Sequence, residues 1–110
     1  MPAIGKTMFK GQSGTQYRFK VFPLGTRFRK LSGVYVVAHR GRDDDGRVRH
    51  AALYVGHTAD FSEPLSEHDK SKDFTEHGAN CICVQSDKLA ASREKKQQDL
   101  LASLSPQCNC

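Results

Sequence analysis

The sequence lacks both an apolar run long enough to cross a membrane and a recognisable export signal. A membrane-spanning helix needs about 20 predominantly apolar residues, and no run in this chain approaches that length. The first ten residues contain no continuous apolar core followed by a small-residue cleavage site. We therefore expect a cytoplasmic protein without a membrane partner. A chain of 110 residues fits one domain.

Acidic residues are scarce in the first half of the chain. Residues 1–50 contain 11 Lys and Arg against 3 Asp (+8), whereas residues 51–110 contain 6 basic and 9 acidic side chains (−3), so the formal net charge is +5. A basic half favours a polyanionic partner, which gains affinity from phosphate contacts and counterion release. A solubilising surface is the alternative, and composition alone does not separate the two.

The four cysteines occur as two Cys-x-Cys pairs, Cys81/Cys83 and Cys108/Cys110. On a strand, the members of one pair point to the same face, which suits a core or half of a metal site. Zinc sites more often separate paired ligands by two to four residues. Buried or idle thiols are therefore favoured over a metal site built from all four cysteines, which remains the alternative.

Alternating and apolar segments predict four strands. Residues 1–15, rich in Gly and small or polar residues, are expected to form a flexible arm, with the folded domain over 16–110. Tyr17–Phe22 alternates as a half-buried strand, placed at a sheet edge because Pro23 ends it. Gly33–Ala38 and Ala51–Val55 form an antiparallel hairpin around the polar turn 41–49. Cys81–Gln85 is the last strand.

Capping residues and stop signals predict three helices: one from Asp60 or Ser62 to His68, one over Lys72–His77 stopped by Gly78, and one from Ser86 or Asp87 to Leu104. The last helix has a stripe that is apolar at its ends and polar at Arg93 and Gln97. A polar side chain facing inward must be hydrogen-bonded, because unpaired burial costs about 1–3 kcal/mol. The alternative is a helix edge from which long side chains reach water.

The order of these motifs resembles the GIY-YIG nuclease superfamily over roughly residues 17–109. The matching segments are Gly33-Val34-Tyr35, Tyr54-Val55-Gly56 followed by His57-Thr58, then His68, Gly78-Ala79-Asn80, and Pro106-Gln107-Cys108-Asn109. The resemblance implies an α+β fold with a three-stranded antiparallel sheet flanked by helices. Tyr17–Phe22 would add an extra N-terminal edge strand.

The resemblance also implies a phosphodiester-cleaving site. Tyr35 and Tyr54 would share one cleft and help to activate water or hold the phosphate, beside His57 and His68. A carboxylate on the last helix would bind one Mg²⁺ or Mn²⁺, which polarises the phosphate. An arginine on the first short helix would neutralise the phosphoryl charge.

Two positions depart from the family pattern. Pro64 stands at the arginine position and Gln97 at the glutamate position. A glutamine amide is a weaker ligand for a hard cation than a carboxylate. Arg93 and Glu94 are the nearest candidate substitutes, as a cation and a metal ligand respectively.

The sequence therefore predicts a nuclease-like protein that binds nucleic acid, DNA rather than RNA, with weak or no cleavage. The alternatives are an active metal-dependent endonuclease that uses Arg93 and Glu94, and a protein-interaction module. The expected phosphate-facing set shares positive charge and position in the basic half: Arg27, Arg29, Lys30, Arg40, Arg42, Arg47 and Arg49.

Overall fold

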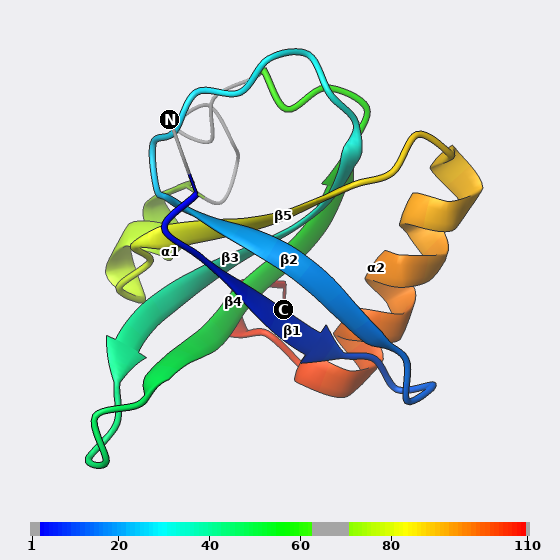
Figure 1. The fold of residues 1–110 in the computed structure, drawn as a ribbon. Coiled ribbons are helices and arrows are strands. Elements are labelled where there is room, and N and C mark those ends of the chain that lie inside the picture. Colours follow the sequence, from blue (N-terminus) through cyan, green and yellow to red (C-terminus); the bar gives the residue numbers. More distant parts are fainter. Residues whose placement is uncertain (1–2, 63–70, 110) are drawn as a thin grey trace.

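Five antiparallel strands form one strongly curled sheet, an open half-barrel, with two helices against it (Figure 1). The computed structural model describes residues 3–62 and 71–109. The elements in chain order are β1 (Gly5–Lys10), β2 (Gln16–Pro23), β3 (Gly33–Arg42), β4 (Val48–Thr58), α1 (Ser71–Glu76), β5 (Cys81–Ser86), α2 (Ala90–Leu104) and the 3₁₀ turn η2 (Gln107–Asn109). The strand order is β1-β2-β5-β3-β4, so β1 and β4 are the edges.

This sheet corrects the expected fold class. The sequence predicted a three-stranded antiparallel sheet flanked by helices, with one extra edge strand, but the structure has a single curled antiparallel sheet of five strands with two helices. The additional strand is β1, which pairs with β2 from Gly5↔Val21 to Lys10↔Gln16. Its pattern is weak in the sequence because Phe9 is its one buried side chain.

The N-terminal segment and β2 both differ from expectation. Residues 1–15, expected as a flexible arm, contain β1 and the turn that leads into β2. Strand β2 is internal rather than an edge, because it lies between β1 and β5. Pro23 is tolerated there because it is the last residue of the strand, opposite Cys81.

The other predicted strands and two of the three predicted helices are confirmed, with shifted ends. The hairpin is β3–β4, and its turn contains Gly46 at φ 80°. The helix expected over Lys72–His77 is α1, and Gly78 at φ 81° follows it. Helix α2 ends at Leu104, but its N-cap residue is Leu89, which has no side-chain capping bond. The helix predicted to end at His68 lies mostly outside the described residues.

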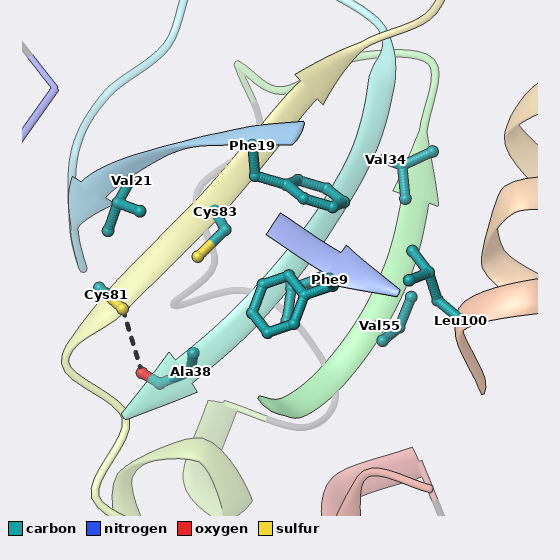
Figure 2. Close-up of a cluster of buried hydrophobic side chains, with 10 residues drawn as sticks. Phe9, Phe19, Val21, Val34, Ala38, Val55, Cys81, Cys83 and Leu100 are labelled. Atoms are coloured by element: carbon teal, nitrogen blue, oxygen red, sulfur yellow. Dashed lines mark hydrogen bonds between the residues drawn. The ribbon is translucent and has the colours of Figure 1, made fainter. Parts of the chain in front are cut away.

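The core inside the curl is apolar and comes from all five strands and α2. Phe9 and Phe19 meet edge to face, with ring centroids 5.6 Å apart. Around them lie buried side chains of β2, β3, β4, β5 and α2 (Figure 2): Val21, Val34, Val36, Ala38, Val55, Cys81, Cys83 and Leu100. The strands are rich in valine because β-branched side chains suit a pleated, buried surface.

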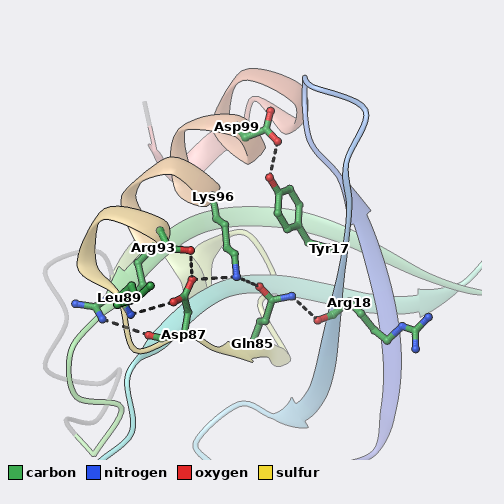
Figure 3. A network of polar contacts seen from close by, with 9 residues as sticks. Tyr17, Arg18, Gln85, Asp87, Leu89, Arg93, Lys96 and Asp99 are labelled. Carbon is green, nitrogen blue, oxygen red and sulfur yellow. Dashed lines mark hydrogen bonds and ion pairs between the residues drawn. The ribbon is translucent and has the colours of Figure 1, made fainter.

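Helix α2 closes the open side of the half-barrel by bonding to both edge strands. Gln97 Nε2 donates to the Val55 carbonyl of β4 at 3.2 Å, and Ser103 Oγ donates to the Lys10 carbonyl of β1 at 2.6 Å. Asp99 accepts a bond from Tyr17 Oη at 2.6 Å and holds the β1–β2 turn (Figure 3). Polar contacts thus supply much of the docking, which explains the few apolar residues on this helix. No helix among the described residues is long and apolar enough to cross a bilayer.

Asn109 covers the outer edge of β4 at the residue that Gln97 also contacts. Its Oδ1 accepts from the Val55 N–H at 2.8 Å, and its Nδ2 donates to the Val55 carbonyl at 3.0 Å. One side-chain amide therefore replaces a neighbouring strand. Asn80 does the same for Arg40 on β3, where β5 does not extend.

We expect Asn109→Ala to lower the free energy of unfolding by about 1–3 kcal/mol, because a buried backbone N–H loses its partner. Urea denaturation measures the change. Gln98→Ala, on the exposed side of α2, is the matched control and should stay within about 0.5 kcal/mol of the parent protein. Equal stability of the two variants would show that the β4 edge does not need this amide.

Candidate functional site

Tyr35 of β3 and Tyr54 of β4 stack on the outer face of the curled sheet. Their ring centroids are 6.1 Å apart with an interplanar angle of 30°. Gly56, opposite Tyr35 in the register, leaves the space that the two rings occupy. A Cβ at Gly56 would lie 2.6 Å from the Tyr35 hydroxyl and 2.9 Å from Tyr54 Cε2. The two tyrosines therefore lie side by side, and that they share a catalytic cleft stays a prediction.

Phenylalanines from three other segments pack around this pair. Phe61 lies 6.0 Å from Tyr35, and Phe74 of α1 lies 5.3 Å from Tyr54, between ring centroids. Phe28 contacts Phe61 at 5.8 Å, and it also meets Phe22 of β2 at 5.1 Å. This second apolar cluster is separate from the core inside the curl. It anchors the loop between β2 and β3 over the tyrosine pair.

The environment keeps Tyr35 protonated at neutral pH. Burial, followed by the neighbouring Tyr54 with which it hydrogen-bonds, raises the pKa of Tyr35 far above its ordinary value of about 10. A phenol that holds its proton this tightly is a poor general base. Tyr35 can instead donate its hydroxyl proton to Tyr54 or to a bound oxygen.

Gln97 does not face an open metal site. Its Nε2 is bonded to the Val55 carbonyl, and Asn109 bonds the same peptide group. The polar centre of the last helix stripe is therefore a structural contact with the β4 edge, rather than a side chain reaching for water. Both side chains contact Val55, the residue that follows Tyr54 on β4.

The donors present do not fit Mg²⁺ or Mn²⁺, the cofactors that the resemblance implies for an active enzyme. Hard cations take carboxylate oxygens in preference to a neutral amide. Glu94, the suggested substitute ligand, is exposed on α2. Within residues 3–62 and 71–109, no group of three or more His, Cys, Asp or Glu side chains could hold a metal ion. A metal role for Gln97 or Glu94 therefore has no matching donor set in the described part of the chain.

Arg93 and His57 lie on the other side of the sheet from the tyrosine pair. Neighbouring residues of a strand point to opposite faces, and Gly56 faces Tyr35, so His57 points toward α2. Arg93, on the inner side of α2, is 7% exposed. Its Nη1 donates to the Asp87 carbonyl at 3.2 Å (Figure 3). Arg93 is thus bonded to the start of its own helix and does not lie beside the tyrosines as a substitute cation.

His68 and Pro64 fall outside the described residues, and so do the acidic residues near them in the sequence. The expected catalytic set of Tyr35, Tyr54, His57, His68 and Arg93 is accordingly divided. The two tyrosines come together, whereas Arg93 and His57 face the opposite side.

The seven residues expected to face phosphates form two separate groups, one at each end of β3. Arg27, Arg29 and Lys30 precede the strand and are exposed, and the others occupy the β3–β4 hairpin. Ten residues of strand span about 33 Å. The two groups therefore cannot contact the same phosphate.

Two arginines of the hairpin group, Arg42 and Arg49, are already bonded within its own turn. Arg49 Nε forms an ion pair with Asp43 at 2.7 Å, and this pairing is the main reason that the pKa of Asp43 lies below its usual range. Arg42 Nη1 donates to the Gly46 carbonyl at 2.7 Å. Arg40 is only partly exposed. Burial is the main cause of the lowered pKa of His50, and the charge of Arg40 is the second cause. The group before β3 is the stronger phosphate-binding candidate.

The cysteines do not form one cluster in the described part of the chain. Cys81 and Cys83 are buried in the core inside the curl, whereas Cys108 belongs to the cluster around the tyrosines. Cys81 Sγ donates to the Ala38 carbonyl at 3.5 Å (Figure 2). The hydrogen bond with Cys81, followed by burial, raises the pKa of Cys83. These three residues behave as buried thiols, and Cys110 is outside the described residues.

A polar network beside α2 was missed by the sequence reasoning. Asp87 accepts bonds from Ser92 Oγ at 2.5 Å and Lys96 Nζ at 2.9 Å (Figure 3). These contacts hold its pKa near 2, with the Ser92 hydrogen bond as the largest cause. Lys96 also donates to Gln85 on β5 at 2.8 Å. The available signal was Asp87, predicted as a possible cap of the last helix, and its bonds to the Leu89 N–H, Ser92 and Lys96 give it a structural role.

Comparison with known proteins gives no further assignment. No protein-family model, curated protein or solved structure matches this chain significantly. The motif resemblance and the geometry around Tyr35 and Tyr54 are therefore the basis for a functional proposal.

We expect Tyr35 to ionise well above pH 10. Absorbance at 295 nm, followed during alkaline titration, measures this because the chain has only three tyrosines and no tryptophan. Replacing Tyr35 with Phe should remove the latest-titrating component and leave the earlier ones. Because the folded state holds this proton more tightly, the free energy of unfolding should fall as pH rises above about 10. If all three tyrosines of the wild-type protein ionise near pH 10, the Tyr35 hydroxyl is not buried and hydrogen-bonded as the structure shows.

Proposed function

We propose that this protein binds the phosphate backbone of nucleic acid, DNA in preference to RNA, through the loop between β2 and β3, and that it does not cleave what it binds. The observation that carries the proposal is the position of Arg27, Arg29 and Lys30. All three are exposed, and they flank Phe28, whose ring is anchored in the cluster that includes Tyr35. The GIY-YIG motif resemblance supports the same class of ligand.

Hydrogen bonds hold both ends of the loop, which favours binding. Gly25 adopts φ 92°, and the Thr26 N–H and hydroxyl both bond to the Pro23 carbonyl. At the other end, the Leu31 carbonyl accepts from the Phe61 N–H at 2.8 Å. A loop held in one conformation loses less entropy when it binds. Asp60 lies in electrostatic reach of Lys30, and its carboxylate is bonded mainly to Ser62.

The absence of cleavage is proposed from the roles of the candidate groups. Tyr35 keeps its proton, Gln97 is bonded to the β4 backbone, and Arg93 lies against Asp87 on the other side of the sheet. Removing one charge-stabilising donor commonly costs about 10²- to 10³-fold in rate. The combination favours a binding protein over an efficient nuclease.

The binding site is tested with two variants that remove the same charge. Arg27→Ala/Arg29→Ala/Lys30→Ala should weaken binding to a labelled DNA by at least about 10-fold and make the dependence of log K on log salt shallower by about 2–3. Arg42→Ala/Arg47→Ala/Arg49→Ala should have a smaller effect, because two of its three arginines are already bonded within the turn. Fluorescence anisotropy across a salt series measures both.

Lack of binding by the parent protein at about 50 mM salt would refute the proposal. Equal losses for the two variants would also refute it, because the affinity would then follow net charge and not this loop.

Supercoiled plasmid should remain intact when incubated with the protein and Mg²⁺ or Mn²⁺. Gel electrophoresis of the plasmid topoisomers measures nicking. Tyr35→Phe is the control for contaminating nucleases, because it removes one hydroxyl from the candidate site. Metal-dependent nicking that Tyr35→Phe abolishes would contradict the non-cleaving part of the proposal and favour an endonuclease.

A further inference from the structure

The outer face of β1 and β2 carries a second group of cations, which we call the basic strip. Residues of one face alternate along each strand, and this face carries Lys6, Lys10, Arg18 and Lys20, together with Met8. All four cations are exposed. Figure 3 shows Arg18 pointing away from α2 while Tyr17, its neighbour in β2, points toward it.

No acidic side chain in residues 3–62 and 71–109 forms an ion pair with the strip. The first 42 residues contain no Asp or Glu, so none lies on β1 or β2. In the described part of the chain the ion pairs are Arg49–Asp43 and Lys96–Asp87, and neither involves the strip. Lys6 and Lys20 are direct cross-strand partners, an arrangement of like charges that destabilises a sheet. A polyanion bound across the pair would remove that repulsion.

Protection of a sheet edge does not explain the whole strip. Edge strands often carry lysines that prevent pairing with another chain, and this accounts for Lys6 and Lys10 on β1. It does not account for Arg18 and Lys20, because β2 is internal and pairs with β5 on its other side.

The strip lies on the same face as the tyrosine pair. Directly paired residues of an antiparallel sheet share a face, and the pairings connect one row across all five strands: Lys6, Lys20, Val84, Tyr35 and Gly56. Four strand spacings make this row about 19 Å long, measured along the sheet. Phe22, two residues after Lys20 on β2, contacts Phe28 of the loop between β2 and β3. The strip and the loop therefore adjoin on one surface.

We propose that the basic strip is a second contact surface for the same nucleic acid, so that the bound backbone runs from the loop beside Tyr35 across β2 to β1. The inference rests on the proposed function and extends its footprint. The loop would then share the bound backbone with β1 and β2, and not with the arginines of the β3–β4 hairpin that the sequence predicted. The cations of the strip contact phosphates and carry no base preference.

The test compares two triple variants that lower the net charge equally. Lys6→Ala/Arg18→Ala/Lys20→Ala should make the salt dependence of oligonucleotide binding shallower by about 2 and weaken binding at least about 10-fold at low salt. Lys72→Ala/Lys88→Ala/Lys95→Ala, three exposed cations on or beside the helices, should change binding less than about 2-fold. Thermal unfolding should show that both variants stay folded, because all six side chains are exposed.

The outcomes separate this inference from the proposed function. If the parent protein binds and the loop variant loses affinity while the strip variant does not, the strip is not a contact surface and this inference alone is wrong. If the parent protein does not bind at low salt, both fail. If the strip variant loses affinity and the loop variant does not, the strip stands and the loop proposal fails.

Vesicles of phosphatidylserine test whether the strip instead recognises a lipid surface, which offers the same phosphate charge. The proposal predicts that the strip variant loses oligonucleotide binding. The contrary result is that the parent protein sediments with the vesicles, while the strip variant loses vesicle binding and keeps its oligonucleotide affinity. That result would overturn the proposal and identify the strip as a membrane-binding surface.

Discussion

The hydrogen bonds from α2 and the C-terminal turn to the edge strands are the constraint on which the fold depends. A curled sheet of five strands leaves an open side between β1 and β4. Helix α2 spans that opening, with Gln97 bonded to β4 and Ser103 bonded to β1. Asn109 adds two bonds to Val55. Unpaired strand edges are costly when buried and prone to association when exposed, so these few side chains stabilise both edges of the sheet.

The same constraint positions the candidate site. Closing the curl from inside leaves the outer face of β5, β3 and β4 to be covered by the loop between β2 and β3 and by α1. Phe28, Phe61 and Phe74 perform that covering and surround Tyr35 and Tyr54. Among the residues that the structure describes, no such cover lies over the outer face of β1 and β2, and this face is basic. A surface with aromatic residues at one end and cations at the other is therefore a direct consequence of how the sheet is closed.

Local patterns in the sequence were sufficient for most elements but not for their assembly. The β3–β4 hairpin, β5 and α2 have clear apolar runs or stop signals, and Gly46 and Gly78 mark turns that require positive φ. Strand β1 was missed because Phe9 is its one buried side chain, and its place in the sheet depends on pairing with β2, which is a tertiary interaction. Pro23 suggested an edge strand, although a proline at the end of an internal strand loses no ladder bond.

The candidate site was predictable only in part, for a similar reason. The contact between Tyr35 and Tyr54 follows from their diagonal positions on the paired strands of a hairpin, and a sequence can reveal such a pairing. The direction of Arg93 and Gln97 depends on how α2 is turned against the sheet, and neither the stripe nor the family resemblance determined that. The cations of the basic strip escaped notice because their significance appears only when β1 and β2 are seen side by side.

The most direct test of the account is to map the nucleic-acid contact on the protein residue by residue. In a titration of ¹⁵N-labelled protein with a short DNA oligonucleotide at low salt, the account predicts amide shift changes at residues 27–30, at Tyr54, and along β1 and β2 at Lys6 and Lys20. The amides of Lys88 and Lys95 should stay in place. Changes confined to α2 or to the β3–β4 turn, or no change at any residue, would contradict it.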